Sequence, residues 1–347
     1  MTADLRAGIV GYGLAGAVFH APLIAATPGL RVAAIVTRNP ERAAQAAREH
    51  PGARVVGSVD ELLHGGVDLV VVATPNREHV PVALAALEAG AAVVVDKPMA
   101  ATAADARALA EAAERRGRPL TVFHNRRWDG DFLTVRRLRD EGRLGDVVRF
   151  ESRFDRWRPE VAAGRWRELA DPADAGGLLF DLGSHLVDQA VVLFGAPVSV
   201  YAEVAARRPG AVVDDDVFVA LEHPGGERSH LWATMLASEP APRFRVLGER
   251  GAYVKAGLDP QEDQLKAGKR PGDAGWGEDP EPGRLAAGDA SEPVPTEPGA
   301  YERFYASVAG ALRDGAPLPV EPGEAARVIE ILEAARASAR EHRVVMI

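Results

Sequence analysis

The chain has 347 residues, with 41 Lys plus Arg against 50 Asp plus Glu, so its net charge is −9. It contains no cysteine, which excludes disulfides, thiolate zinc sites, iron–sulfur clusters and Cys nucleophiles. The length suggests about two domains. The acidic balance argues against a nucleic-acid partner, because phosphate binding needs clustered Lys and Arg. A metal would need His and carboxylates alone, and we expect none.

The N-terminal residues Met1 to Arg6 show no basic segment followed by an apolar stretch, so no signal peptide is visible. No apolar run approaches the roughly 20 residues that cross a bilayer. We therefore expect a cytoplasmic protein without a membrane partner.

The first 124 residues alternate between strand-like and helix-like segments, which predicts βαβ units and a doubly wound parallel sheet. The predicted strands are Arg6–Val10, Arg31–Val36, Arg54–Val56, Asp68–Ala73, Ala92–Val95 and Pro119–Phe123. The predicted helices are Leu14–Ala26, Pro40–His50, Glu78–Ala89 and Thr102–Arg116.

From residue 125 to 347 the pattern changes, so we place a domain boundary near Asn125. After residue 194 the predicted strands follow one another without helices between them, which predicts an α+β domain with an open, mostly antiparallel sheet. The predicted strands are Asp146–Phe154, Val198–Ala206, Asp216–Glu222, His230–Leu236 and Phe244–Leu247. The predicted helices are Phe132–Glu141, Leu178–Phe194, Ala300–Arg313 and Pro322–Glu341. Residues 257–299, dense in Gly, Pro and Asp, are predicted as a long loop.

A glycine motif, Gly11-x-Gly13-x-x-Gly16, lies between the first strand and the first helix. Such glycines allow a tight turn, let the backbone approach a pyrophosphate and let the helix pack on the strand. The helix N-terminus then faces the phosphates. The position predicts dinucleotide binding, and the alternative is a glycine turn in an unrelated α/β fold.

The end of the second strand indicates which dinucleotide is bound. NAD-specific folds usually carry an acid about 20 residues after the motif, where it binds the ribose 2′-hydroxyl. Here the strand ends in Thr37 and Arg38, and Arg can bind a 2′-phosphate through charge-assisted hydrogen bonds. We therefore predict NADP(H) as the preferred cofactor and NAD(H) as the alternative. Arg38 could otherwise stack on the adenine or simply face solvent.

Lys97, in Asp96-Lys97-Pro98, follows the fifth predicted strand. Ligands of doubly wound sheets bind beyond the carboxyl ends of the strands, so Lys97 is placed to reach a nicotinamide. A solvated loop lysine is the alternative.

A polar stripe is predicted on the helix Leu178–Phe194, because its polar residues recur at helical spacing. Its members are Asp181, Ser184, His185, Asp188 and Gln189. Three interpretations stay open: a solvent-facing stripe, a metal site, and a cleft wall in which His185 accepts a proton beside Asp181.

A polar and aromatic segment, His124 to Asp129, directly follows the sixth predicted strand. Its residue types suit either a carbohydrate-like ligand or an interdomain salt-bridge cluster.

Together these motifs resemble the glucose–fructose oxidoreductase/inositol dehydrogenase (Gfo/Idh/MocA) family over essentially the whole chain. The resemblance rests on the glycine motif, on Ala73-Thr74-Pro75-Asn76 with His79, on Asp96-Lys97-Pro98, and on Gly176-Gly177 followed by Asp181, Gly183, His185 and Asp188. Asp96 departs from the commoner Glu of the family. His124 to Asp129, Gly257 to Asp263 and Trp276-Gly277 look closer to the NADP-dependent scyllo-inositol dehydrogenases.

The resemblance implies an N-terminal Rossmann domain over 1–124 and a substrate-binding, oligomerising domain over 125–347, in a homodimer or homotetramer. It implies catalysis by Lys97, Asp181 and His185. The implied substrate-binding residues are His124, Arg127, Trp128, Asp181 and His185. The implied cofactor-binding residues are Gly11, Gly13, Leu14, Ala15, Gly16, Thr37, Arg38, Thr74, Pro75, Asn76, His79, Asp96 and Lys97.

The implied reaction is hydride transfer between NADP(H) and a secondary alcohol of a polyol or sugar, with scyllo-inositol as the model. His185 would take the hydroxyl proton and Lys97 would stabilise the developing alkoxide. Within the family, an aldose dehydrogenase or ketose reductase is the nearest alternative. An NAD-dependent glycoside hydrolase and a non-catalytic nucleotide sensor are the others.

Overall fold

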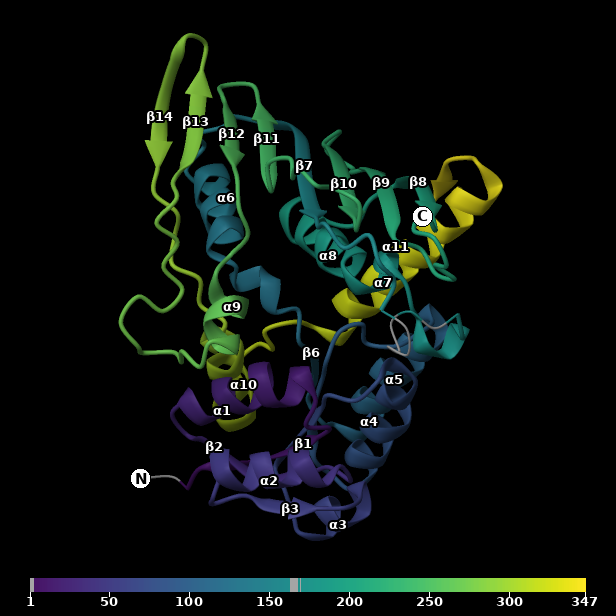
Figure 1. Ribbon diagram of the computed structural model, residues 1–347, viewed down its shortest axis with the longest axis vertical. Helices are drawn as coiled ribbons and strands as arrows, with labels where there is room; N and C mark the ends of the chain where they lie inside the picture. Colours follow the sequence, from purple (N-terminus) through teal and green to yellow (C-terminus); the bar gives the residue numbers. More distant parts are fainter. Residues whose placement is uncertain (1–2, 163–167, 169) are drawn as a thin grey trace. The chain divides into compact units, whose positions relative to one another are not determined.

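The computed structural model describes residues 3–162, 168 and 170–347, and it divides into two compact units (Figure 1). Unit 1 comprises Met1–Asn125, Gln261–Trp276 and Ala300–Ala326. Unit 2 comprises Arg126–Pro260, Gly277–Gly299 and Arg327–Ile347. Two later segments thus fold with the first 125 residues, a grouping that a single boundary along the sequence does not describe.

Unit 1 contains a six-stranded parallel sheet in the order β3-β2-β1-β4-β5-β6. Its strands are β1 (Leu5–Val10), β2 (Leu30–Val36), β3 (Arg54–Val56), β4 (Leu69–Val72), β5 (Ala92–Val95) and β6 (Leu120–Val122). Every residue of β4 and β5 is buried. Both strands are covered on both faces, which explains why they are apolar at consecutive positions. The predicted doubly wound parallel sheet is confirmed.

The helices of unit 1 are η1 (Ala15–His20), α1 (Ala21–Ala26), α2 (Pro40–Glu49), α3 (Val59–His64), η2 (Asn76–Glu78), α4 (His79–Glu88), α5 (Ala103–Arg116), α9 (Gln261–Lys266) and α10 (Glu302–Asp314). The segment Leu14–Ala26, predicted as one helix, begins as the π-helix η1 and continues as α1. Asn39, Ser58 and Thr102 cap α2, α3 and α5 by accepting a backbone N–H three residues on. The helix α3 was not among the predicted elements.

Unit 2 contains a nine-stranded mixed sheet in the order β14-β13-β12-β11-β7-β10-β9-β8-β15. Its strands are β7 (Val147–Asp155), β8 (Ser199–Ala205), β9 (Asp216–Glu222), β10 (Arg228–Thr234), β11 (Phe244–Gly248), β12 (Ala252–Lys255), β13 (Gly283–Ala287), β14 (Ala290–Val294) and β15 (Val345–Met346). Only the pairing of β7 with β10 is parallel among the described strands of this sheet, so the mostly antiparallel prediction is confirmed. The long loop predicted over 257–299 is wrong in part, since it contains α9 and the hairpin β13–β14.

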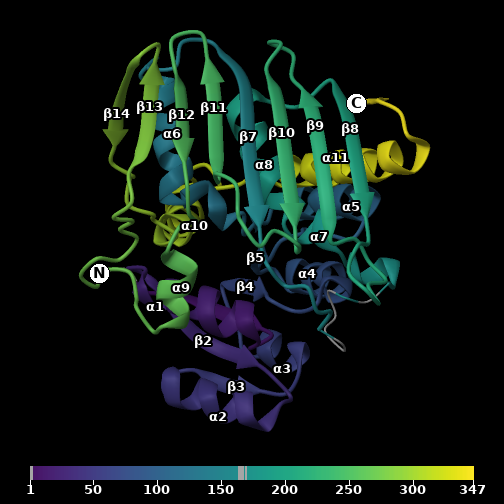
Figure 2. The same ribbon diagram turned by 45° about the horizontal axis from the view of Figure 1, so that its top comes forward.

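The remaining helices are η3 (Asn125–Trp128), α6 (Gly130–Asp140), η5 (Pro172–Asp174), α7 (Leu178–Asp181), α8 (Gly183–Phe194) and α11 (Pro322–Glu341). Figure 2 shows α6 and α8 on one face of the sheet of unit 2, and none of the helices that the structure describes lies on the opposite face. The single helix predicted over Leu178–Phe194 is interrupted at Leu182, whose carbonyl accepts the N–H groups of both His185 and Leu186. That shared acceptor tightens the chain locally and separates α7 from α8.

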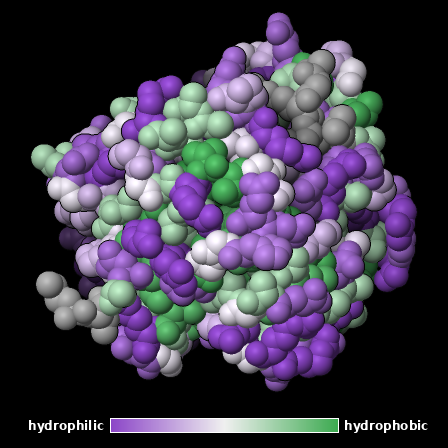
Figure 3. Space-filling view, turned by 90° about the horizontal axis from the view of Figure 1, so that it is seen from below, coloured by the Kyte–Doolittle hydropathy of each residue, from purple (hydrophilic) through white to green (hydrophobic). Residues whose placement is uncertain are grey.

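Among the described residues, no single helix has the length and apolarity to cross a membrane. One pair of helical segments, Pro172–Asp181 and Gly183–Phe194, would together be long and apolar enough, but the two are bent by 62° relative to each other, and only their length and composition point to a membrane span. Hydrophilic side chains prevail on the face seen in Figure 3, with apolar side chains in small groups between them.

Candidate functional site

The turn after β1 contains two glycines, Gly11 and Gly16, that no other residue could replace without strain. Gly11 has a φ of +97°, and a Cβ there would lie 2.5 Å from the carbonyl oxygen of Ala73. A Cβ on Gly16 would overlap the carbonyl oxygen of Gly11. A Cβ on Gly13 would meet only Arg42 Nη1, at 3.7 Å. The first and third glycines therefore satisfy packing within the protein, while the second faces open space of the kind that a pyrophosphate occupies.

This turn lies where the strand order of the sheet reverses. β1 has β2 on one side and β4 on the other, which makes the β1–β4 edge the point where doubly wound sheets bind ligands. Thr74 follows β4, and its buried Oγ1 has no hydrogen-bond partner in the described part of the chain. Leu14, within the glycine motif, is 54% exposed. The turn, the unsatisfied hydroxyl and the exposed leucine fit a dinucleotide, and contacts of Gly11, Gly13, Leu14, Ala15 and Gly16 with its pyrophosphate stay predictions.

Basic side chains lie at the junction of β2 and α2. Arg38 is exposed just beyond β2, and Thr37 Oγ1 accepts the Asn39 N–H at 3.4 Å. Arg42, in the first turn of α2, brings its guanidinium to within contact distance of the Gly13 position. We did not predict Arg42 from the sequence, because its proximity to the glycine turn comes from the parallel pairing of β1 with β2. Arg38 and Arg42 together fit an anionic group at this end of the site.

His79 is buried and supports the loops that follow β4 and β5. Its Nδ1 lies 2.8 Å from the Pro98 carbonyl oxygen and its Nε2 3.0 Å from the Thr74 carbonyl oxygen. Burial lowers the pKa of His79, against the opposing effect of Asp96 and of the two carbonyls. Asn76 is also buried, whereas Pro75 is exposed. His79 thus links the two loops from inside, and a direct contact with the cofactor stays a prediction.

Lys97 lies in the loop after β5. Its backbone N–H donates to Asp96 Oδ1 at 2.9 Å, and its side chain is partly exposed. The backbone of Asp96 continues the sheet, since its N–H donates to the Val72 carbonyl. The loop therefore presents Lys97 at the carboxyl edge of the sheet, as predicted from its position after the strand.

In unit 2, His185 and Asp181 lie on either side of the break between α7 and α8. His185 is 5% exposed, and its ring centroid is 6.3 Å from that of Phe154. Asp181 is partly exposed, and its carbonyl accepts the Ser184 hydroxyl. The solvent-facing stripe is wrong as an interpretation, because Ser184, Asp188 and Gln189 are at most 1% exposed.

Asp188 and Gln189 are held by partners that lie far away in the sequence. Arg127 Nη2 donates to Asp188 Oδ1 at 2.7 Å, and its Nε lies 3.0 Å from Oδ2. Gln189 donates to the Arg126 carbonyl and accepts from Arg243. These two polar residues therefore stabilise the packing of α8 within unit 2.

The residues of the segment His124 to Asp129 are mostly buried. Arg126 pairs with Asp129 at 3.3 Å, and Arg127 pairs with Asp188, both within unit 2. His124 is 2% exposed, and Trp128 is partly exposed. The segment thus forms buried ion pairs inside one unit, and substrate contacts by His124, Arg127 and Trp128 stay predictions.

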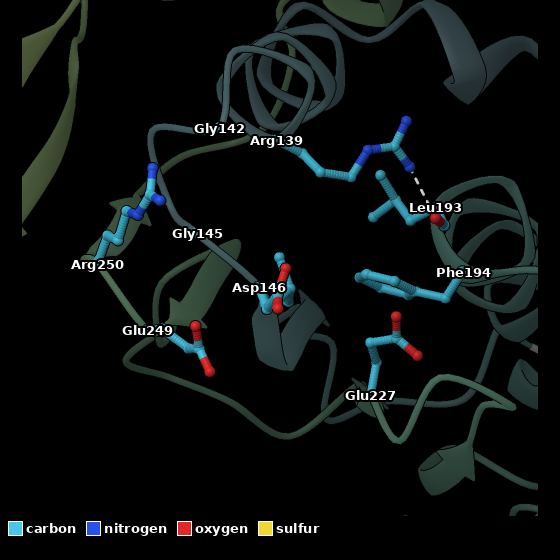
Figure 4. Close-up of a pocket in the computed structure, with 10 residues that line it drawn as sticks. Arg139, Gly142, Gly145, Asp146, Leu193, Phe194, Glu227, Glu249 and Arg250 are labelled. Carbon is cyan, nitrogen blue, oxygen red and sulfur yellow. Dashed lines mark hydrogen bonds between the residues drawn. The ribbon is translucent and has the colours of Figure 1, made fainter.

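Two further features of the described residues bear on ligands. No group of three or more His, Asp or Glu side chains within them is arranged to hold a metal ion. A pocket of about 500 Å³ in unit 2 is lined by residues of α6, α8 and nearby loops and contains none of the predicted site residues. Figure 4 shows the Glu227 carboxylate beside the Phe194 ring in this pocket, and Arg139 donating to the Leu193 carbonyl.

The sheet order, the glycine turn and the lysine at the sheet edge define the class of a nicotinamide-dependent dehydrogenase. Family models agree: residues 5–124 match the oxidoreductase family, NAD-binding Rossmann fold, and residues 136–347 match its C-terminal alpha/beta domain. The chain therefore belongs to the Gfo/Idh/MocA oxidoreductase family. It is an enzyme, a dehydrogenase that acts on CH–OH groups.

Particular relatives match over the full length of the chain. An uncharacterised oxidoreductase of Escherichia coli, YdgJ, is 44% identical, covering 100% of this chain and 99% of its own. IolW of Bacillus subtilis, named scyllo-inositol 2-dehydrogenase (NADP(+)), is 39% identical, covering 99% and 96%. The crystal structure of an oxidoreductase from Bacillus cereus is 31% identical and superimposes with a TM-score of 0.89, covering 99% of each chain.

Proposed function

We propose that this chain interconverts a secondary alcohol of a cyclitol, with scyllo-inositol as the model substrate, and the corresponding ketone, with NADP(H) as its preferred cofactor. The observation that carries the proposal is the full-length identity of 39% with IolW, an enzyme named for that reaction and that cofactor. The exposed Arg38 after β2, in place of an acid, supports the NADP(H) preference.

In the proposed reaction the cofactor supplies the hydride acceptor or donor. Lys97 orients the substrate hydroxyl and stabilises negative charge that develops on its oxygen, because an ammonium group interacts more strongly with an alkoxide than with an alcohol. His185 takes the hydroxyl proton during oxidation and returns it during reduction. Asp181 binds neighbouring substrate hydroxyls or orients the imidazole.

A substrate panel tests this proposal. The purified chain is offered scyllo-inositol, other inositols, aldoses and glycosides with NADP⁺ or NAD⁺, while the absorbance of the reduced nicotinamide is followed. We expect the highest kcat/KM for a cyclitol with NADP⁺. A preference for an aldose, or for NAD⁺, would contradict the proposal. Cleavage of a glycoside without net reduction of the cofactor would point to the hydrolase alternative.

We also propose that the chain forms a homodimer or homotetramer through the face of the unit 2 sheet that is left open by the described helices. Aromatic rings lie on this face: Phe218 and Trp232 have centroids 5.1 Å apart, and the Arg153 guanidinium lies 3.8 Å from the Trp232 ring centroid. Partly exposed aromatic and Arg side chains are enriched in protein interfaces. Sedimentation of the Trp232→Glu variant should give a smaller species than the wild type, and an unchanged oligomer would refute this face as the interface.

A further inference from the structure

A buried imidazole and a buried phenol meet inside unit 1. His20, at the end of η1, has its Nδ1 2.6 Å from the Tyr305 hydroxyl of α10. Both residues are 0% exposed. The ring of Phe123 packs against both of them, with centroids 4.4 Å from His20 and 6.0 Å from Tyr305. The orientation of the imidazole is therefore fixed by packing as well as by the hydrogen bond.

The other nitrogen of this imidazole faces Asp96. His20 Nε2 lies 3.9 Å from Asp96 Oδ1, the oxygen that also accepts the Lys97 backbone N–H. The separation is too long for a direct hydrogen bond, so the interaction is electrostatic. One carboxylate oxygen thus lies between a buried imidazole and the backbone of Lys97.

The surroundings indicate which nitrogen of His20 carries the proton. Burial lowers the pKa of His20 to about 4, against the opposing effect of Asp96, so the imidazole is neutral near pH 7 and carries one N–H. If Tyr305 donates to Nδ1, that N–H is on Nε2 and points toward the carboxylate. The other tautomer would direct a lone pair at a negative charge, which is unfavourable in a low-dielectric interior.

Two further groups of unit 1 act on Asp96. His79 of α4 and the hydroxyl of Tyr305 both interact electrostatically with the Asp96 carboxylate. Burial raises the pKa of Tyr305 well above its ordinary value, and Asp96 adds to this effect, so the phenol keeps its proton and remains a donor. Groups from η1, α4 and α10 therefore lie near the partly exposed carboxylate that precedes Lys97.

We propose that His20 and Tyr305 are positioning residues, which orient the Asp96 carboxylate and thereby hold the backbone of Lys97 in place for catalysis. This inference rests on the proposed function, in which Lys97 acts on the substrate hydroxyl. It assigns a role to a histidine and a tyrosine that lie 285 residues apart in the sequence.

The Tyr305→Phe variant tests the kinetic part, because it removes only the hydroxyl and keeps the ring packing. We expect kcat to fall about 10- to 100-fold, the usual effect of a small displacement of a catalytic group, with the Kd of the cofactor unchanged. Thr121→Val is the matched control, since it removes a buried hydroxyl that donates to the Val320 carbonyl at 2.7 Å in the same unit. Both variants should lower the Tm, but only Tyr305→Phe should lower kcat.

The tautomer of His20 tests the structural part without any assay of activity. In protein labelled with ¹⁵N-histidine, with the His20 signals assigned from the His20→Gln variant, we expect a protonated Nε2 and an unprotonated Nδ1 at pH 7. In Tyr305→Phe, we expect faster hydrogen exchange of the Lys97 amide. A wild-type kcat in Tyr305→Phe, or a proton on Nδ1 in the wild type, would overturn the inference.

These readouts separate the inference from the proposed function. If the wild type turns over no compound of the panel, the proposed function fails. The tautomer and the exchange of the Lys97 amide still decide whether His20 and Tyr305 hold Asp96. His20→Gln, whose amide N–H can replace the Nε2 donor, should retain more activity than His20→Leu.

Discussion

Lys97 and His185 are held in place by different kinds of local structure. Lys97 follows a fully buried strand, and its backbone N–H is bound by the preceding carboxylate. His185 lies in the first turn of α8, buried beside Phe154. A general base contributes about 10²–10⁴-fold to a rate. We therefore expect His185→Ala to lose at least about 100-fold in kcat while it binds NADPH normally, as measured by steady-state kinetics and cofactor titration.

A control for this variant is His64→Ala, because His64 is an exposed histidine of α3 that bonds only to the Asp60 carbonyl among the contacts described. Its kcat should equal that of the wild type. A His185→Ala enzyme with near-normal turnover would show that another group accepts the proton.

Arg38 provides a second test at the residue scale. If it binds the 2′-phosphate, Arg38→Ala removes charge-assisted hydrogen bonds worth roughly 1.5–3 kcal/mol, which corresponds to about a 10- to 100-fold rise in the KM for NADP⁺. The KM for NAD⁺ should not change. Arg48→Ala, an exposed position in the last turn of α2, should alter neither value. Equal effects of Arg38→Ala on both cofactors would contradict the assignment.

The residues of the glycine turn could be predicted from the sequence, whereas the burial of the polar residues of α8 could not. The positive φ of Gly11 and the contact of Gly16 with the Gly11 carbonyl both arise within one βα turn, so the spacing of these glycines is local information, although Gly11 also lies against the Ala73 carbonyl of the loop after β4. Asp188 is buried by Arg127, 61 residues away, and Gln189 by Arg243, 54 residues away. Helical periodicity alone cannot distinguish a buried, paired carboxylate from a solvated one.

At the scale of elements, strands and helices with clear caps could be predicted to within a few residues, as Asn39 and Thr102 illustrate. The interruption at Leu182 could not, because apolar and polar residues continue at helical spacing through it. The hairpin β13–β14 was also missed. β14 is mostly exposed and contains Pro293, so it lacks the alternating pattern of a half-buried strand.

The turn after β1 gives a prediction about stability. Gly11→Ala would force an L-residue into a φ of +97° and bring its Cβ against the Ala73 carbonyl. We expect a loss of at least about 2 kcal/mol in the free energy of unfolding, measured with urea in the absence of cofactor. Gly52→Ala is the control, because no atom lies within 4 Å of its added Cβ. Equal stability of the two variants would contradict this account of the turn.

At the scale of the whole molecule, one buried carboxyl makes stability depend on pH. Burial raises the pKa of Asp131 from 3.8 to about 6, with Arg243 opposing and Asp129 adding to the rise. The folded state therefore favours the protonated form. Its contribution is present below pH 3.8 and is lost as the pH rises through about 6. The difference corresponds to roughly 3 kcal/mol.

Asp131→Asn removes this titration. We expect the free energy of unfolding of the variant, relative to the wild type, to improve by up to roughly 3 kcal/mol between pH 4 and pH 7. Denaturant unfolding at several pH values measures this difference. A difference that stays constant with pH would show that Asp131 ionises normally in the folded state.

The composition of unit 1 has a consequence for how the chain is made. Phe123 packs against Phe304, and His20 bonds to Tyr305; both partners belong to α10, which is synthesised long after the strands of unit 1. Unit 1 is complete only when its last segment, Ala300–Ala326, has left the ribosome. An emerging N-terminal half therefore exposes apolar surface throughout most of synthesis, a period in which a chaperone can bind it. Unit 1 therefore cannot be completed until α10 has been synthesised.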